Sequence, residues 1–214
     1  MKPRRAVLFD WRGTLAHCPP PVWWAERALG SISRPATASA LAAATAAHED
    51  AGDLPDIDSS AERHREATLR VFARHGLDAE LAEALYGLDA DPANHPLYPD
   101  AGPVLREIQA RGVGIALISD FHLDLRPVLA HHGIADLFDA WVLSFEHGIQ
   151  KPDPRMFTLA LDALAVRPEH ALMVGDRASH DGGAAAAGIA TLILPPPPER
   201  LEPRGLDIVT RLLG

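Results

Sequence analysis

The sequence predicts an α/β protein: a doubly wound parallel sheet with a small α-helical insertion after its first strand. Three observations support this fold class. In the C-terminal half of the 214-residue chain, short apolar runs alternate with segments that have helical periodicity. A similar apolar run, AVLF, lies near the N-terminus, and between the two parts residues 22–88 carry alanine, leucine and arginine at helical spacing. Because parallel strands need crossover helices, this order favours one sheet with one inserted helical segment.

The first predicted strand lies in AVLFDWRGTL, residues 6–15. Its apolar run ends in Asp10 and is followed by Gly13 and Thr14, which is typical of a buried strand that stops at a tight loop. In an open α/β sheet, ligands bind at the carboxyl ends of the strands. Asp10 is therefore the first candidate functional residue.

The insertion follows a proline-rich segment, CPPPVWW, and contains four predicted helices. They cover residues 22–29, 36–51, 60–75 and 79–86, with breaks at Gly52-Asp53, Pro55 and Gly76. We expect the last three to form a small bundle. Prolines disfavour any regular element in the return linker, residues 91–102. The expected domains are a core of residues 1–16 and 99–214 and a helical cap of residues 17–98.

Strands and helices alternate over the rest of the core. Helices are predicted over residues 101–111, 123–131, 153–165 and 181–187. Strands are predicted in GIALIS (114–119), WVLS (141–144), HALMVGD (170–176) and ATLIL (190–194). We expect the last of these to be buried, and PPPPER (195–200) to form a stiff loop.

Composition excludes several classes of function. The formal net charge of -9 argues against nucleic acid or an anionic membrane as a partner, so a small substrate is favoured. No apolar stretch approaches the roughly 18 residues of a membrane span, and the basic N-terminus containing Lys2 lacks the apolar run of a signal peptide. With Cys18 as the only cysteine, no internal disulfide can form, and a cytoplasmic location is expected.

Polar residues follow several of the later strands. Ser119 ends GIALIS, and Lys151 lies directly before Pro-Asp-Pro in a chain that otherwise uses arginine almost everywhere. In MVGDRASHDGG, Asp176 follows a predicted strand and Asp181 comes five residues later. Two carboxylates at that spacing can meet at one cation, and Mg²⁺ is the hard ion that suits carboxylate, carbonyl, water and phosphate oxygens. The sequence contains no GxxxxGK[ST] motif, so it does not predict a P-loop.

These segments together resemble the four motifs of the haloacid dehalogenase-like hydrolase superfamily, whose core is a Rossmann-like α/β sheet. The resemblance implies a phosphatase in which Asp10 is the nucleophile, forms an aspartyl-phosphate and is assisted by Lys151. It implies that a small phosphorylated substrate is held by Thr14, Ser119, Asp120 and Lys151. It also implies that Mg²⁺ is held by Asp10, the backbone carbonyl of Arg12, Asp176 and Asp181.

Arg12 departs from this pattern, because motif I usually has a second aspartate at this position. That aspartate protonates the leaving group and then activates water, whereas a guanidinium stays charged and cannot transfer the proton. Loss of a positioned acid–base group typically costs about 10²–10⁴ in rate. His17 and His48 are alternative proton donors. Arg12 itself is a candidate to bind a second anionic group of the substrate, since its fork geometry suits carboxylate or phosphate.

Three alternatives remain open. DWRGT is similar to the motif of phosphonoacetaldehyde hydrolase, but that reaction needs a cap lysine and this cap has none. A 2-haloacid dehalogenase also lacks the second aspartate, but it lacks the metal-binding Gly-Asp, which is present here as Gly175-Asp176. The third alternative is a catalytically impaired binding protein in which Arg12 forms an ion pair with Asp10 or Asp176.

The cap is expected to set substrate specificity, because helices that close over the strand ends contact the rest of the substrate. Trp23 and Trp24 are candidates to line that pocket, although packing of cap against core is the favoured interpretation of both side chains.

Overall fold

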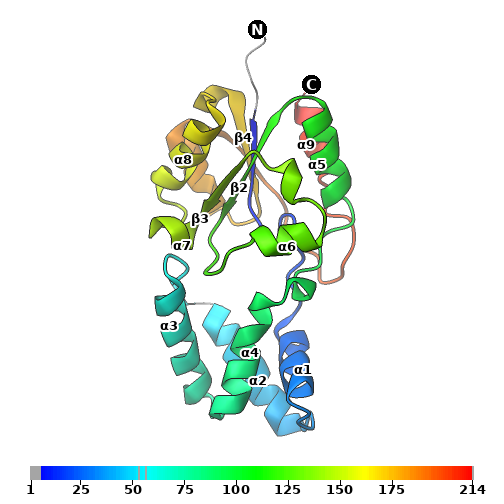
Figure 1. Ribbon diagram of the computed structural model, residues 1–214, viewed down its shortest axis with the longest axis vertical. Coiled ribbons are helices and arrows are strands. Elements are labelled where there is room, and N and C mark those ends of the chain that lie inside the picture. Colours follow the sequence, from blue (N-terminus) through cyan, green and yellow to red (C-terminus); the bar gives the residue numbers. More distant parts are fainter. Residues whose placement is uncertain (1–5, 53, 56, 214) are drawn as a thin grey trace.

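A computed structural model of the chain describes residues 6–52, 54–55 and 57–213, so Lys2 and Asp53 lie outside the described residues. Five parallel strands form one sheet in the order β3-β2-β1-β4-β5 (Figure 1). The strands are β1 (Ala6–Phe9), β2 (Gly114–Ser119), β3 (Ala140–Leu143), β4 (Ala171–Gly175) and β5 (Ala190–Ile193). The predicted α/β fold class is confirmed, and β1, which carries Asp10 at its end, lies at the centre of the sheet.

Each face of the sheet is covered by helices because successive residues of a strand point to opposite faces. Val7 and Phe9 belong to a core cluster with residues of α5, α6 and α9, whereas Leu8 belongs to a second cluster with residues of α8. Figure 1 accordingly shows α5 and α9 on one side of the sheet and α8 on the other. These helices are α5 (Ala101–Ala110), α6 (Arg126–His131), α8 (Pro154–Leu164) and α9 (Asp207–Leu212).

The structure corrects several predicted core elements. The last strand, β5, is predicted to be buried, but its two end residues are exposed and its two middle residues are half-buried. Residue 144, predicted to end a strand, instead begins the short helix α7 (Ser144–His147). The segment predicted as a helix over residues 181–187 is a 3₁₀-helix, η5 (Asp181–Ala187). Gly182 and Gly183 disfavour an α-helix there, and a Cβ on Gly183 would lie 2.7 Å from Pro152.

We call the helical segment between β1 and α5 the cap. It contains the helices α1 (Pro21–Ser31), α2 (Ala38–Gly52), α3 (Ala61–Arg74) and α4 (Ala79–Gly87). Ser60 and Asp78 cap α3 and α4 by accepting hydrogen bonds from backbone N–H groups of their first turns. The prediction that the last three helices form the bundle is wrong in one respect. All four pack together, because Trp24 and Leu29 of α1 share one apolar cluster with residues of the other three helices.

The return segment is more ordered than its prolines suggest. It contains two short 3₁₀ turns, η1 (Leu88–Ala90) and η2 (Pro92–Asn94), and α5 already begins at Ala101. Pro92 is tolerated because it occupies the first turn of η2, where its missing N–H has no partner to lose. Two further 3₁₀ turns, η3 (Ala135–Leu137) and η4 (Pro168–His170), precede β3 and β4.

The two connections between cap and core run side by side. The N–H of His17 donates to the carbonyl of Pro96 at 2.8 Å, and the N–H of Tyr98 donates to the carbonyl of Leu15 at 3.0 Å. Figure 1 shows α1 to α4 grouped at the end of the sheet where β1 leads into the cap. The division at residues 16/17 and 98/99 stays a prediction that these paired connections support. Within the described ranges, every helix is too short or too polar to cross a membrane.

Candidate functional site

A cavity lies between the carboxyl ends of the strands and the cap. The core contributes Asp10, Ser119, Asp120, Lys151 and Asp181, and the cap contributes Asp58, His64 and Asp89. Polar residues that are far apart in sequence therefore meet at one edge of the sheet, as the parallel topology predicts.

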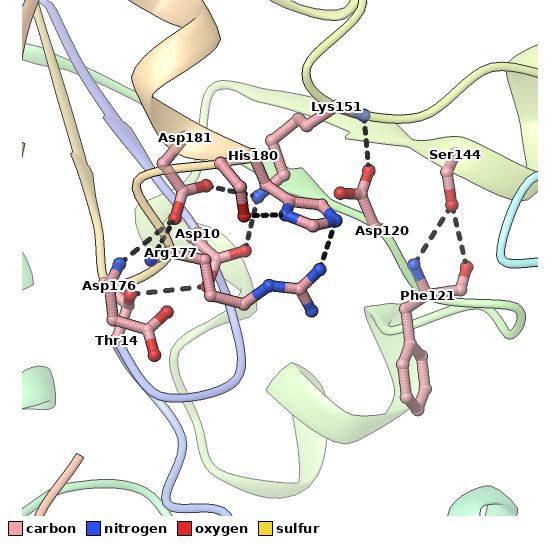
Figure 2. A network of polar contacts seen from close by, with 11 residues as sticks. Asp10, Thr14, Asp120, Phe121, Ser144, Lys151, Asp176, Arg177, His180 and Asp181 are labelled. Atoms are coloured by element: carbon pink, nitrogen blue, oxygen red, sulfur yellow. Dashed lines mark hydrogen bonds and ion pairs between the residues drawn. The ribbon is translucent and has the colours of Figure 1, made fainter. Parts of the chain in front are cut away.

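Lys151 lies at the centre of the polar network in this cavity (Figure 2). Its Nζ donates to Asp10 Oδ1 and to Asp181 Oδ1, each at 2.6 Å, and its side chain is 2% exposed. Although burial alone lowers the pKa of Lys151, the carboxylates of Asp10, Asp120 and Asp181 raise it above its usual value. Lys151 is therefore a permanent positive charge between two buried carboxylates.

Asp10 is held from both of its carboxylate oxygens. Lys151 donates to Oδ1, and the hydroxyl of Thr14 donates to Oδ2 at 3.3 Å, which together fix the rotation of the carboxylate. Burial raises the pKa of Asp10 to about 7, Lys151 acts in the opposite direction, and the charges of Asp181 and Asp176 add to the rise. The cluster carries more negative than positive charge, and this excess suits a bound cation.

Asp181 organises the loop that follows β4. Its Oδ2 accepts hydrogen bonds from the backbone N–H groups of Asp176 at 3.1 Å and Arg177 at 2.9 Å, while its Oδ1 faces Lys151. Gly175 allows this close approach, because a Cβ there would lie 2.2 Å from the Asp181 carboxylate. Asp181 is thus a fully engaged side chain whose oxygens already have three donors.

Asp176 has the opposite environment. Its Oδ1 is buried and has no hydrogen-bond partner among the residues that the structure describes. Gly13, with φ of +79°, lies so close that a Cβ would be 2.2 Å from Asp176 Oδ2. Oxygens of Asp10, Asp176 and Asp181 lie within 4.8 Å of one another. An all-oxygen group with one buried, unpaired carboxylate oxygen fits a hard divalent cation such as Mg²⁺.

Ser119 and Asp120 lie at the end of β2. Ser119 is 2% exposed and lines the cavity. The Oδ1 of Asp120 accepts a hydrogen bond from the backbone N–H of Lys151 at 2.9 Å, so this side chain positions the lysine loop. Burial raises the pKa of Asp120, and Lys151 opposes this rise.

Arg12 points towards the cap and not towards Asp10 or Asp176, the two partners considered for it in the alternative of a catalytically impaired binding protein. Its guanidinium forms an ion pair with Asp89 of η1 and lies 4.7 Å from the ring centroid of Phe121 and 5.4 Å from that of Trp24. Burial raises the pKa of Asp89, but Arg12 outweighs this and the result is a pKa of about 2. Sequence reasoning missed Asp89 because only the folded cap brings it to Arg12.

The two histidines considered as proton donors lie elsewhere. His17 packs edge-on against Tyr98, and His48 stacks on Trp24 with ring centroids 5.3 Å apart. Neither lines the cavity that contains Asp10. Burial lowers the pKa of His17 and lowers that of His48 to about 4, so both imidazoles are neutral at pH 7.

Trp24 is buried in the apolar cluster of the cap helices, and the Arg12 guanidinium of the core lies 5.4 Å from its ring centroid. It therefore packs mainly within the cap, whereas the interpretation favoured from the sequence is packing of cap against core. Trp23 packs edge-on against Trp24 at 5.0 Å, and neither tryptophan lines the cavity. The cavity instead contains His64 and His122, which sequence reasoning did not single out. The one available signal for His122 is its position three residues after Ser119.

Comparisons with known proteins identify the family of this chain. A family model for haloacid dehalogenase-like hydrolases matches residues 4–188. The phosphoserine phosphatase of Thermus thermophilus is 44% identical over 112 residues, which is 51% of this chain and 44% of that protein. The glyceraldehyde 3-phosphate phosphatase of Methanopyrus kandleri is 32% identical over 216 residues, covering 96% of this chain and 90% of that protein.

A crystal structure of a dehalogenase shares the fold, with a TM-score of 0.74 and 23% identity over 100% of this chain and 98% of that one. The chain spans about half the length of the first curated relatives that it matches, between 44% and 52%. The family match and the Methanopyrus relative nevertheless cover most of this sequence. The chain therefore belongs to the haloacid dehalogenase-like hydrolases.

Proposed function

We propose that this protein is a Mg²⁺-dependent phosphohydrolase that acts on a small phosphorylated metabolite through an aspartyl-phosphate on Asp10. One observation carries the proposal: the Asp10 carboxylate, oriented by Lys151 and Thr14, lies beside Asp176 and Asp181 at the floor of a cavity. The relatives named as phosphatases support the same reaction class. A cytoplasmic location, inferred from the single cysteine, is part of the proposal.

In the first step, a carboxylate oxygen of Asp10 attacks phosphorus in line, the bond from phosphorus to the leaving oxygen breaks, and an acyl phosphate forms on Asp10. Water then cleaves the acyl phosphate and releases inorganic phosphate, which restores the carboxylate. The ammonium of Lys151 offsets the charge that Asp10 and the phosphoryl oxygens share. The hydroxyl of Ser119 and the backbone N–H of Asp120 are proposed to hold a phosphoryl oxygen.

The residues fit Mg²⁺ because the donor set consists of oxygens and includes the unpaired Oδ1 of Asp176. Asp10, Asp176 and the backbone carbonyl of Arg12 would hold the ion directly. Asp181 would act through water, since its own oxygens already accept three hydrogen bonds. When bound, the ion neutralises phosphoryl oxygens and favours attack at phosphorus.

The Arg12–Asp89 pair limits the substrates. The position of the family's usual acid is taken by a guanidinium that is bound to the cap, and neither His17 nor His48 lines the cavity to replace it. Because Asp89 neutralises Arg12, we propose that this arginine joins cap to core rather than attracting a second anion. Substrates whose leaving group needs little protonation should react best.

The test is release of phosphate from acetyl phosphate and p-nitrophenyl phosphate, with Mg²⁺ and with EDTA, for the wild-type protein and Asp10→Asn. We expect turnover that requires both Mg²⁺ and Asp10. An absence of turnover on both substrates, with folding confirmed by circular dichroism, would exclude a simple phosphatase.

Dehalogenation at carbon is the second candidate. A dehalogenase shares the fold, and Arg12 stands at the position of the second motif I aspartate, which 2-haloacid dehalogenases also lack. The Gly175-Asp176 pair beside Asp10 argues against it, since a cation there weakens attack of Asp10 on carbon. Release of chloride from 2-chloropropionate in the presence of EDTA would favour this candidate over the phosphatase.

A further inference from the structure

Three metal-ligating side chains outside the Asp10 network meet on the cap side of the cavity. Asp58 precedes α3, His64 lies in α3, and His122 follows β2 in the core. One ligand atom from each of the three lies within 4.8 Å of the other two. Residues of the cap and of the core therefore share one small cluster across the cavity.

His122 is the member of this cluster whose polar atoms are unexplained. Its side chain is 1% exposed, and both ring nitrogens are buried without a hydrogen-bond partner in the described part of the chain. A buried polar atom that lacks a partner destabilises the folded chain, because it has lost its hydrogen bonds to water. Because His122 lines the cavity, a ligand in that space can supply the missing partner.

His64 has a partner at each ring nitrogen. Its Nδ1 lies 3.3 Å from the hydroxyl of Tyr86, and its Nε2 lies 3.8 Å from Asp58 Oδ1. If Nδ1 donates its proton to Tyr86, the lone pair of Nε2 faces Asp58. A partner at the far nitrogen that fixes the tautomer is the usual outer shell of a metal-ligating imidazole.

The segments that carry these residues are fixed to each other. The hydroxyl of Ser144 donates to the backbone carbonyl of Asp58 at 2.6 Å and accepts from the backbone N–H of Phe121 at 3.0 Å. Figure 2 shows Ser144 directed at the Phe121 backbone. The loop before α3 and the loop after β2 are thus held together next to the cluster, which limits the reorganisation that a ligand would require.

We propose that Asp58, His64 and His122 form a binding site for a divalent transition metal of the zinc class, separate from the Asp10 cluster. Two imidazoles and one carboxylate are a common donor set for Zn²⁺ and leave one position open to the cavity, whereas Mg²⁺ prefers oxygen ligands. The ion joins cap to core, because two ligands come from the cap and one from the core.

The charge states agree with this assignment. Burial lowers the pKa of His122 to about 3 and that of His64 to about 4, so both rings are neutral at pH 7, as metal ligands must be. The two rings stack with centroids 3.5 Å apart and planes 5° from parallel. Because each lone pair lies in the plane of its ring, binding of one ion requires the rings to turn out of this stack.

The test measures metal binding rather than activity. Protein freed of metal by a chelator is titrated with Zn²⁺ against a chromophoric competitor in the presence of excess Mg²⁺, and Co²⁺ is added separately to record its visible absorption. We expect one site per chain, a visible Co²⁺ band and a higher melting temperature with Zn²⁺. Absence of Zn²⁺ binding to the wild-type protein would overturn the proposal.

Variants locate the site. His64→Gln, Asp58→Asn and His122→Ala should each weaken Zn²⁺ binding by at least ~10-fold. Two controls should bind Zn²⁺ as the wild type does: His147→Ala, at an exposed histidine of α7, and Asp176→Asn, in the proposed Mg²⁺ site. If His122→Ala does not fold, the other two variants decide the question. Unchanged Zn²⁺ affinity in folded His64→Gln and Asp58→Asn would place the ion elsewhere and refute the proposal.

Discussion

Replacement of Asp89 by asparagine tests whether the Arg12–Asp89 ion pair holds the cap on the core. The substitution keeps the shape of the side chain and removes its charge. Arg12 then lies between Phe121 and Trp24 without the carboxylate that it contacts directly. The two side chains are 32% and 18% exposed, so water compensates only part of the loss.

The magnitude follows from the pKa of Asp89. Its value falls from 3.8 to about 2 on folding, a shift of about 2 units, and each unit corresponds to about 1.4 kcal/mol. The full shift corresponds to about 3 kcal/mol. Because the two side chains are partly exposed, water recovers part of this, and we expect Asp89→Asn to lower the free energy of unfolding by about 2 kcal/mol, below the 3–5 kcal/mol for a fully buried pair. Because the folded pKa is depressed, this stabilisation is complete above about pH 4 and is lost as the pH falls through about 2.

The assay is urea-induced unfolding at pH 7, followed by fluorescence and circular dichroism. The matched control is Glu66→Gln, which breaks an exposed ion pair with Arg70. It should lower the free energy of unfolding by no more than about 0.5 kcal/mol. The reasoning is refuted if Asp89→Asn and Glu66→Gln lower stability by the same amount.

Three further predictions concern the site and the cap. Lys151→Met leaves the buried carboxylates of Asp10 and Asp181 without their cation. We expect it to lower the free energy of unfolding by about 3–5 kcal/mol and to abolish phosphate release. Activity within tenfold of wild type would argue against the proposed role of Lys151. His48→Phe keeps the stack on Trp24 and removes a group whose pKa falls from 6.5 to about 4. Because His48 binds a proton more readily in the unfolded state, its neutral form stabilises the folded state less as the pH falls below 6.5. Between pH 7 and 5 the free energy of unfolding of the variant should therefore fall by about 2 kcal/mol less than that of the wild type. Parallel curves of stability against pH for the two proteins would contradict this. Gly13→Ala places a Cβ 2.2 Å from Asp176 at φ of +79°, so we expect a lower melting temperature and weaker activation by Mg²⁺, whereas wild-type Mg²⁺ dependence would mean that Asp176 is not a ligand.

The sequence predicted the parts of the site that follow from local pattern and parallel topology. Asp10 and Ser119 each lie at the end of an apolar run, and the carboxyl ends of parallel strands meet at one edge. Lys151 was predictable as a rare lysine before Pro-Asp-Pro. Because apolar periodicity is also a local pattern, the predicted bounds of most helices and strands lie within a few residues of the observed ones.

What sequence reasoning missed depends on tertiary packing. The partner of Arg12 lies 77 residues away, and nothing local to Asp89 indicates that the cap will bring it to the core. His64 and His122 likewise meet only because α3 lies against the loop after β2. The helix α9 was not predicted, since its burial comes from packing of Leu206 and Val209 on the sheet. Local propensity alone does not determine these contacts.

The central claim, covalent catalysis at phosphorus by Asp10, is tested most directly by detecting the intermediate. The protein is mixed with acetyl phosphate and Mg²⁺, quenched in acid within one turnover, digested and examined by mass spectrometry. We predict one added phosphoryl group on the peptide that contains Asp10, absent from Asp10→Asn. Release of phosphate by wild-type protein without any label on that peptide, or with the label on another residue, would contradict the account.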